Sequence, residues 1–476
     1  MENTISFVLD GKIRHINFSK EKYAPTTTVL NYLRSLPGYK GAKEGCAEGD
    51  CGACTVVIAQ LNQNGSLEYN AVNSCLLFLP RLHGKQLITV EELADTDANL
   101  HPVQQAMVDH YGSQCGFCTP GIVMSLFALY KKDIPVDRGT IEEHLSGNLC
   151  RCTGYQSILN AAEAVLKNRT ADKFTESEQD AIKQLKSIPA RSLSLSNNEE
   201  AYYLPADLKE LLQLRNKYPD AQLINGASDA ALRVTKQFER LPLVIDCSNV
   251  RELQQIEENK NEINIGSGVN INQILQSAEK DFTALFDICI VFGSHPIRNA
   301  ATIGGNLGTA SPIGDLMPVL AAYNADIILE SINGRRTVPA DDFITGYRQT
   351  QMQGNEIIHS IRLPLPPADT AVKMYKISRR KELDISTLSA AFRLKLDKQQ
   401  KIKEIKIIYG GMAACTKHAV KAEQFLTGRT WSQDTAEQTA EIIRDEFEPI
   451  SDARADAEFR SLAAGNLLLK FWSDTQ

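Results

Sequence analysis

The sequence of 476 residues lacks the features of a membrane or nucleic-acid-binding protein. No stretch approaches the ~18 consecutive apolar residues of a membrane-spanning helix. The first twenty residues mix charged and apolar side chains without the apolar core of a signal peptide, so we expect a cytoplasmic protein with no membrane partner. A net charge of −7, from 51 Lys and Arg against 58 Asp and Glu, does not predict a nucleic-acid partner.

Two common motifs are also missing. The eight histidines show no H-x3-H or H-E-x2-H spacing, so we predict no histidine metal ligand. Gly266-Ser-Gly268 follows a predicted strand but lacks the third glycine of a dinucleotide-binding fingerprint, so it is interpreted as a strand-ending turn. Catalysis by a histidine-bound metal and a Rossmann-type site are therefore not expected.

Cysteine, in contrast, is abundant and unevenly placed. Eight of the eleven cysteines lie within the first 152 residues, and in a reducing compartment they predict metal ligands rather than disulfides. The first group is Cys46, Cys51, Cys54 and Cys75. Its C-x4-C-x2-C spacing with a distant fourth cysteine is typical of a plant-type [2Fe–2S] cluster, and interleaved glycines let backbone amides approach the sulfides. A structural zinc site is the alternative, although zinc usually uses paired C-x2-C knuckles.

The second group is Cys115, Cys118, Cys150 and Cys152. The apolar pattern around it predicts helices over 120–130 and 155–166, so the positive ends of two helix dipoles would face a thiolate-rich metal site. Taken alone, this spacing leaves zinc open as the metal.

The chain length predicts three or four domains. We expect a β-rich module over 1–84, a helical module over 85–167, interpreted as a four-helix bundle, and a polar linker over 168–200. Strands alternating with helices predict an α+β domain over 201–369. A second α+β domain, with strands followed by two helices, is expected over 370–476.

Two glycine-rich segments of the third domain could bind a phosphorylated ligand. Residues 223–230 are predicted to form a strand entering a small-residue turn, which can present amides to a pyrophosphate. Residues 301–315 contain four glycines among small hydroxyl and amide side chains and are predicted to form a ligand-binding loop, with a simple connection as the alternative.

These segments together carry a family resemblance. Gln114-Cys-Gly-Phe-Cys-Thr-Pro-Gly121 and Cys150-Arg-Cys-Thr-Gly-Tyr155 resemble the helical [2Fe–2S] domain of the molybdenum hydroxylases, and residues 44–56 resemble the ferredoxin-type domain that precedes it. The glycine-rich segments resemble the FAD domain of the same family. The resemblance implies a multidomain α+β fold: a β-grasp ferredoxin-like domain, a four-helix-bundle [2Fe–2S] domain, a vanillyl-alcohol-oxidase-type FAD domain, and a C-terminal domain like that of CO dehydrogenase flavoproteins.

The resemblance also implies the flavin contacts. The pyrophosphate turn would be Leu223, Ile224, Asn225, Gly226, Ala227, Ser228, Asp229 and Ala230; the residues beside the flavin and along its diphosphate and ribityl would be Phe292, Gly293, Thr302, Ile303, Gly304, Gly305, Asn306 and Thr309. Asp315 would bind the adenosine end or brace the loop, Ile358 and Lys376 would contact the flavin, and Tyr347 would lie where NAD enters. Asn225 and Gly293 depart from the family pattern. Core packing is an equal alternative for Ile358.

The order of domains resembles the small subunit of the two-subunit bacterial xanthine dehydrogenases. It implies two [2Fe–2S] clusters and FAD on this chain, NAD+ as electron acceptor, and a large partner subunit bearing molybdopterin, which hydroxylates hypoxanthine or xanthine, in a heterotetramer of two small and two large subunits. No catalytic residue for purine hydroxylation is expected on this chain. The alternatives are the iron–sulfur and flavin subunit of a molybdenum hydroxylase for aldehydes or N-heterocycles, and a zinc-stabilised adaptor without a redox role.

Overall fold

The computed structural model describes residues 3–62, 64–95 and 99–476, which form two compact units. The first unit contains the residues up to Asp207 together with Ala221–Val250 and Gly293–Ala301, and the second contains Leu208–Asp220, Arg251–Phe292 and Thr302–Gln476. The predicted FAD domain therefore contributes segments to both units. Within the described residues, no helix is long and apolar enough to cross a membrane.

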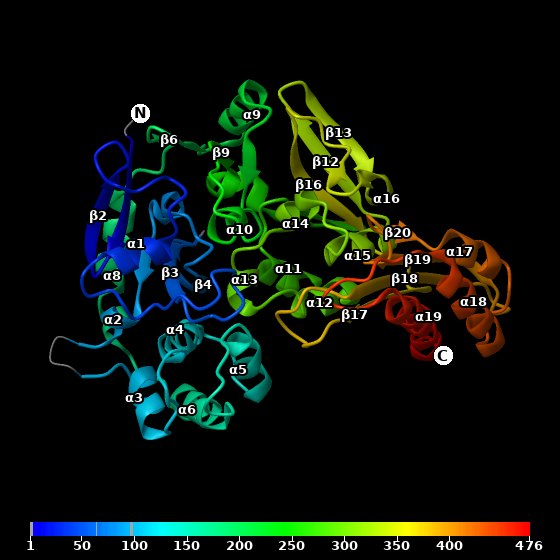
Figure 1. The fold of residues 1–476 in the computed structure, drawn as a ribbon, viewed down its shortest axis with the longest axis horizontal. Helices are drawn as coiled ribbons and strands as arrows, with labels where there is room; N and C mark the ends of the chain where they lie inside the picture. The colour runs from blue at the N-terminus through cyan, green and yellow to red at the C-terminus, as the bar shows by residue number, and fades with distance from the viewer. Residues whose placement is uncertain (1–2, 63, 96–98) are drawn as a thin grey trace. The chain divides into compact units, whose positions relative to one another are not determined.

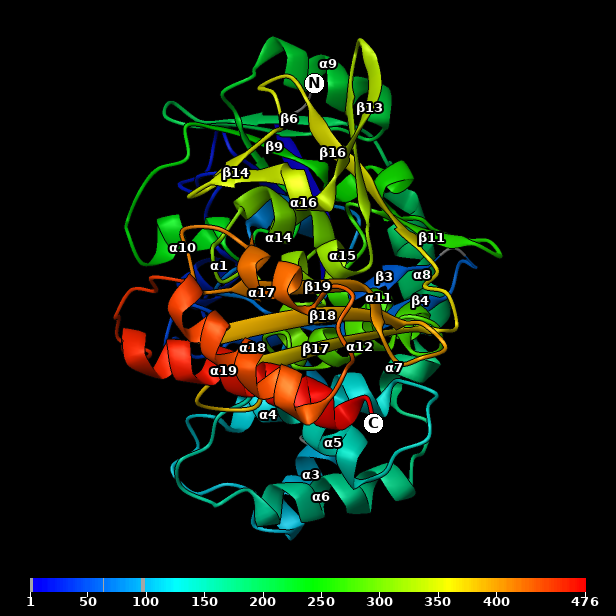
Figure 2. The same ribbon diagram turned by 90° about the vertical axis from the view of Figure 1, so that its right-hand side faces the viewer.

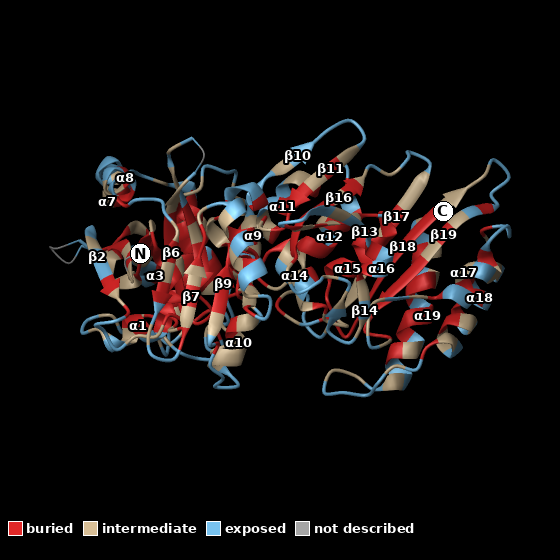
Figure 3. Cartoon of the chain, turned by 90° about the horizontal axis from the view of Figure 1, so that it is seen from above, coloured by how far each residue is buried: buried red, intermediate tan, exposed pale blue. Residues whose placement is uncertain are grey.

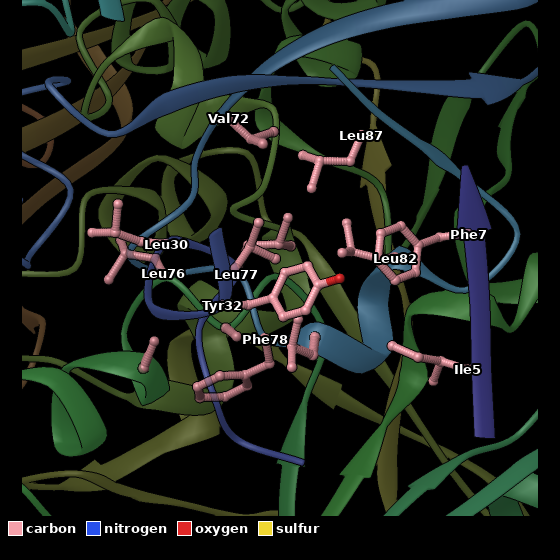
Figure 4. Close-up of a cluster of buried hydrophobic side chains, with 14 of the residues drawn as sticks. Ile5, Phe7, Leu30, Tyr32, Val72, Leu76, Leu77, Phe78, Leu82 and Leu87 are labelled. Carbon is pink, nitrogen blue, oxygen red and sulfur yellow. The ribbon is translucent and has the colours of Figure 1, made fainter. Parts of the chain in front are cut away.

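The first unit begins with a five-stranded sheet in the order β2-β1-β5-β3-β4. Its strands are β1 (Thr4–Leu9), β2 (Lys12–Asn17), β3 (Thr55–Leu61), β4 (Leu67–Asn73) and β5 (Gln86–Ile88). Helix α1 (Val29–Ser35) is capped by Thr28 and packs its apolar face into the core shown in Figure 4, where Tyr32 lies beside Phe7. Because β5 pairs in parallel with β1, this module extends beyond the predicted boundary at residue 84.

A helical module follows. Its helices are α2 (Val90–Leu93), α3 (Pro102–Asp109), α4 (Thr119–Tyr130), α5 (Arg138–Leu145) and α6 (Gln156–Lys167), and Figure 1 shows α3 to α6 gathered together. Helix α4 packs against α3 and α5, and α6 against the same two helices. Residues 121–130 of α4 are all buried, as expected for the central helix of a small bundle.

The segment 168–200, which the sequence predicts to be a polar linker between domains, contains regular secondary structure. It contains α7 (Lys173–Glu176), α8 (Glu178–Ser187) and β6 (Leu193–Ser196). Phe174 is buried against Phe127, and α8 turns only Ile182 and Leu185 inward while its outer side is exposed (Figure 3). A helix with one narrow buried stripe has a mostly polar sequence, so composition alone does not reveal α8.

The first unit is completed by a four-stranded sheet in the order β6-β7-β9-β8, built from β7 (Ala201–Leu204), β8 (Gln222–Ile224) and β9 (Leu243–Asp246). Strands β7 and β8 both run parallel to β9. Helix α10 (Ala230–Thr235) follows β8, and the short helix α13 (His295–Arg298) contacts β4 and α5.

The second unit contains a five-stranded sheet in the order β10-β11-β16-β12-β13. The strands are β10 (Ile256–Glu258), β11 (Glu262–Gly266), β12 (Asp326–Ser331), β13 (Gly334–Pro339) and β16 (Ile357–Pro364), and the hairpin β14 (Ile344–Gly346) and β15 (Gln349–Thr350) lies between β13 and β16 in the chain. The helices are α9 (Leu208–Lys217), α11 (Ile271–Ala278), α12 (Thr283–Ile290), α14 (Ile303–Thr309), α15 (Leu316–Ala322) and α16 (Ala340–Phe343). As predicted, Gly266 ends a strand that turns into a helix.

The C-terminal part has a sheet in the order β17-β18-β19-β20 followed by three helices. The elements are β17 (Thr370–Ile377), β18 (Leu388–Leu396), β19 (Ile402–Gly410), β20 (Lys417–His418), α17 (Val420–Leu426), α18 (Gln433–Glu446) and α19 (Ala457–Asp474). Figure 2 shows α18 and α19 lying side by side along the sheet. Because α15 also packs on β18, residues 388–394 are all buried.

A histidine joins this C-terminal sheet to its neighbours. The His418 imidazole lies 2.8 Å from a Glu423 carboxylate oxygen and 3.2 Å from one of Asp341, and Lys406 donates to the other oxygen of Asp341 at 2.6 Å. Burial by itself would lower the pKa of His418, but the two carboxylates raise it to about 9.

Candidate cluster and flavin sites

The first cysteine group lies on the loop before β3 and on the turn after β4. Cys46 Sγ accepts backbone hydrogen bonds from Glu48 and Cys51 at 3.4 Å, and the thiols of Cys54 and Cys75 lie 3.4 Å apart. The thiols of Cys54 and Cys75 thus form one close pair, and Cys46 and Cys51 are neighbours on the preceding loop. The Cys51 thiol and the loop amides lower the pKa of Cys46 to about 5, against the opposing effect of burial.

The glycines between the cysteines of the first group are needed because other atoms of the protein lie very close to their backbone. A Cβ on Gly45 would lie 2.7 Å from Cys51 Sγ, and one on Gly52 would lie 2.1 Å from the carbonyl oxygen of Gly147. Gly49 and Gly52 both have positive φ angles, which side chains disfavour. The sequence prediction that these glycines let the backbone wrap closely around the sulfurs agrees with this geometry.

The second cysteine group lies at two helix starts. Cys118 is the N-cap residue of α4, and Cys152 comes four residues before α6. The thiol of Cys115 lies near that of Cys152, and the thiol of Cys118 lies near that of Cys150. The Cys150 sulfur also contacts Thr153 Oγ1 at 3.1 Å.

Both groups have a donor set that fits a [2Fe–2S] cluster. Each offers four cysteine thiols, which suit soft iron–sulfur chemistry, and nearby amides or hydroxyls can hydrogen-bond the sulfurs. The helix starts at Cys118 and before α6 add positive dipole ends beside the second group.

The predicted pyrophosphate turn follows β8. Gly226 packs so closely that a Cβ there would lie 2.0 Å from the carbonyl oxygen of Ala300, and Ala227 has φ +59°. The chain then enters α10, where the Ala231 amide donates to Ala227 at 2.8 Å. This strand, turn and helix start can present backbone amides to a phosphate, which fits the flavin pyrophosphate.

The segment 301–315 is not one long loop, because Ile303–Thr309 form helix α14. Thr302 caps this helix by accepting from the Gly305 amide, and a Cβ on Gly304 would lie 2.5 Å from Ser267 Cβ. Glycine's low helix propensity predicted a loop, but the cap and the close packing on Ser267 stabilise a helical turn. Asn306 Oδ1 is buried without a hydrogen-bond partner among the described residues, which fits an acceptor for a flavin hydroxyl.

Lys376 and Asp315 hold each other. The Lys376 ammonium lies 2.8 Å from an Asp315 oxygen and donates to the Val291 carbonyl at 3.0 Å, while Ser386 donates to the other Asp315 oxygen at 2.5 Å. This network favours the bracing alternative for Asp315. The buried Ile358 side chain lies next to α14, where a Cβ on Gly308 would be 3.9 Å away.

The predicted flavin residues divide between the two compact units. Residues 223–230 and Gly293 belong to the first unit, whereas Phe292, residues 302–309, Asp315, Ile358 and Lys376 belong to the second. Tyr347, also in the second unit, is exposed on the turn between β14 and β15.

Sequence reasoning missed a cluster of charged groups in the first unit. Glu143 contacts His144 at 2.8 Å, His295 at 3.1 Å and the fully buried Arg298, and the two imidazoles are stacked. Ligand atoms of the acid and both histidines lie within 4.8 Å of one another. Because Arg298 already neutralises Glu143, the group is an ion-pair network rather than a cation site. Its members are about 150 residues apart, so spacing gives no signal.

Three parts of the chain match the models of known protein families. Residues 89–163 match the [2Fe-2S] binding domain, residues 195–366 the FAD binding domain in molybdopterin dehydrogenase, and residues 373–475 the CO dehydrogenase flavoprotein C-terminal domain. These domains and the cysteine geometry define the class of iron–sulfur flavoproteins.

Individual relatives are more specific. The chain is 32% identical to the xanthine dehydrogenases of Emericella nidulans and Oryza sativa subsp. japonica, over 94% of its own length and 36% and 38% of theirs. The chain thus spans a little over a third of the curated relatives it matches. It belongs to the molybdenum hydroxylases and has the domain composition of their iron–sulfur and flavin part.

Solved structures agree on the fold. A chain of carbon monoxide dehydrogenase from Hydrogenophaga pseudoflava is 25% identical with a TM-score of 0.55, covering 58% of this chain and 96% of that one. A chain of quinoline 2-oxidoreductase from Pseudomonas putida 86 is 24% identical with a TM-score of 0.53, covering 59% and 98%.

Proposed function

We propose that this chain is the electron-transfer subunit of a xanthine dehydrogenase. It would receive electrons from a molybdopterin-bearing large subunit that hydroxylates hypoxanthine or xanthine and would deliver them to NAD+. A heterotetramer of two small and two large subunits is the proposed assembly. The observation that carries the proposal is the presence of two complete four-cysteine groups in adjacent modules, followed by the flavin domains of the family.

Each group of residues has a separate task in this proposal. Cys46, Cys51, Cys54 and Cys75 would ligate one [2Fe–2S] cluster, and Cys115, Cys118, Cys150 and Cys152 the other. The amides of residues 223–230 and of the start of α14 would bind the FAD diphosphate, and Asn306 would accept from a flavin hydroxyl. When bound, the clusters supply one-electron chemistry and FAD supplies the change to hydride transfer. The Asp315–Lys376 pair would hold the flavin-binding segment rigid, and the exposed Tyr347 would lie where NAD enters.

A second candidate is the corresponding subunit of another molybdenum hydroxylase. The likeness to chains of carbon monoxide dehydrogenase and quinoline 2-oxidoreductase supports it. Xanthine dehydrogenase is preferred because relatives of that name match across 94% of the chain.

Metal and flavin analysis tests the cofactors. The purified chain should hold about four irons and one FAD, because each four-cysteine site binds one [2Fe–2S] cluster. Cys54→Ser and Cys118→Ser should each lose about half the iron, whereas Cys415→Ser, outside both groups, should lose none. Zinc in place of iron, in a colourless protein without flavin, would support the adaptor alternative and overturn the proposal.

Enzyme assays test the division of labour. The isolated chain should oxidise NADH with an artificial dye but should not turn over hypoxanthine. Purification with the native partner, followed by assays with hypoxanthine, aldehydes and nicotinate, separates the two candidate functions. Turnover of aldehyde or nicotinate without hypoxanthine would favour the second candidate.

A further inference from the structure

The module with the first cysteine group and the helical module with the second pack with their backbones in direct contact. A Cβ on Gly121 of α4 would lie 2.1 Å from the carbonyl oxygen of Gly52, and a Cβ on Gly52 would lie 2.1 Å from that of Gly147. Neither position can hold a side chain without moving the other module. The first cysteine loop is therefore in direct contact with the start of α4 and with the turn before Cys150.

Asn148 fixes the register of this contact. Its side chain is buried, and its amide nitrogen donates to the Gly52 carbonyl at 3.1 Å and to Thr55 Oγ1 at 3.2 Å. Its amide oxygen accepts from Ser125 of α4 at 2.6 Å. One side chain thus ties the first cysteine loop, the start of β3 and the central helix of the second module together.

Leu149, the residue after Asn148, forms a backbone hydrogen bond to the first cysteine loop. The Leu149 amide donates to the Cys51 carbonyl at 3.0 Å. Cys51 belongs to the first cysteine group, and Leu149 is bonded to Cys150 of the second. A path from Cys51 to Cys150 therefore consists of covalent bonds within the two segments and one hydrogen bond, from the Leu149 amide to the Cys51 carbonyl.

We infer that Asn148 is a positioning residue for electron exchange between the two cysteine groups, and that the Leu149–Cys51 hydrogen bond is the connection it maintains. The inference rests on the proposed function. In the exchange, one electron would pass between the cluster that Cys46, Cys51, Cys54 and Cys75 would hold, and the one that Cys115, Cys118, Cys150 and Cys152 would hold; one would be oxidised as the other is reduced, with no bond broken and no proton moved. Electronic coupling falls less steeply through bonds than across a gap, so one well-placed hydrogen bond favours this path.

A competing path runs through Phe117, between Cys115 and Cys118. A Cβ on Gly45, next to Cys46, would lie 3.5 Å from the Phe117 ring, so this side chain also approaches the first loop. Gly45 itself has no Cβ, so this path would cross a gap between the two side chains' positions, and the Phe117 side chain is exposed. It provides the comparison that the experiment needs.

The experiment uses the full-length protein with its iron and FAD. The variants are Asn148→Ala, Phe117→Leu, and replacement of Leu149 by its α-hydroxy acid, which exchanges the amide N–H for an ester oxygen. Asn168→Ala is the matched control, because the Asn168 side chain also donates to a backbone carbonyl, that of Ala164 at 3.1 Å, on the surface of α6. Electron paramagnetic resonance gives the signal and midpoint potential of each reduced cluster and, after rapid freezing, the rate of electron exchange between them.

The expected result is slower exchange in the Asn148 variant and in the Leu149 ester, with iron content and both midpoint potentials unchanged. Asn168→Ala and Phe117→Leu should match the wild type. Unchanged exchange in the ester, with full iron content, would overturn the inference, as would slowing in Phe117→Leu alone. If Asn148→Ala fails to fold, the ester decides the question. Absence of two cluster signals in the wild type would overturn the proposed function itself.

Discussion

The buried pair of Lys376 and Asp315 gives the sharpest test of the flavin-binding unit. The two side chains are 4% and 9% exposed, and their charged atoms are 2.8 Å apart. Lys376→Met would leave the Asp315 carboxylate buried with Ser386 as its remaining partner. If the main role of Lys376 is to neutralise Asp315, the substitution should lower the free energy of unfolding and leave the flavin potential unchanged.

The size of the effect follows from the burial. Removing one partner of a buried ion pair costs about 3–5 kcal/mol, because the other charge stays uncompensated. Asp315→Asn should cost a similar amount, since the buried ammonium then keeps only neutral partners. The double variant Lys376→Met/Asp315→Asn should be about 2 kcal/mol less destabilised than the sum of the single variants, because no uncompensated charge remains.

The interaction energy between Lys376 and Asp315 can be measured by urea unfolding, with flavin release as the signal. With a slope of about 2 kcal/mol per molar urea, each single variant should lower the midpoint by about 2 M. Additive single effects would refute the reasoning. So would a stable Lys376→Met protein with a shifted flavin potential, which would place the lysine's main action on the flavin.

Three further predictions test other parts of the chain. His418, with its pKa raised to about 9 from 6.5, contributes stability that is fully present below pH 6.5 and is lost as the pH rises through about 9. The contribution is about 3 kcal/mol at most, and His418→Gln should flatten the change of melting temperature with pH over that window. Gly226→Ala should abolish flavin binding because its Cβ would meet a backbone carbonyl at 2.0 Å, whereas Gly308→Ala, whose Cβ would make an ordinary van der Waals contact with Ile358 at 3.9 Å, should retain flavin absorbance. Glu143→Gln should lower stability in urea by about 3 kcal/mol, since it removes the carboxylate that contacts the buried Arg298 and the two histidines; an unchanged midpoint would contradict the ion-pair assignment.

Local chemistry was readable from the sequence. The spacing of the cysteines predicts both metal-binding groups, because a tight loop and two helix starts set which sulfurs can converge. Asp10 and Gly11 predict the first hairpin turn, and both adopt the positive φ angles that such a turn needs. The apolar pattern likewise predicts the helix over 120–130, where the structure has α4.

Long-range packing was not readable in the same way. The helix at Ile303–Thr309 contradicts the low helix propensity of its glycines, because its stability comes from the Thr302 cap and from packing on Ser267. Helix α8, within 168–200, buries only Ile182 and Leu185, and that burial results from packing in the folded chain.

The sequence by itself predicts the two sets of cysteine ligands, since ligand type and spacing are local properties. Only the tertiary structure decided how the two cysteine groups are joined. Gly52, Gly121 and Asn148 are up to 96 residues apart, and their contact depends on glycines that let two backbones touch. Sequence spacing carries no record of such a contact, because it arises from the packing of separate modules.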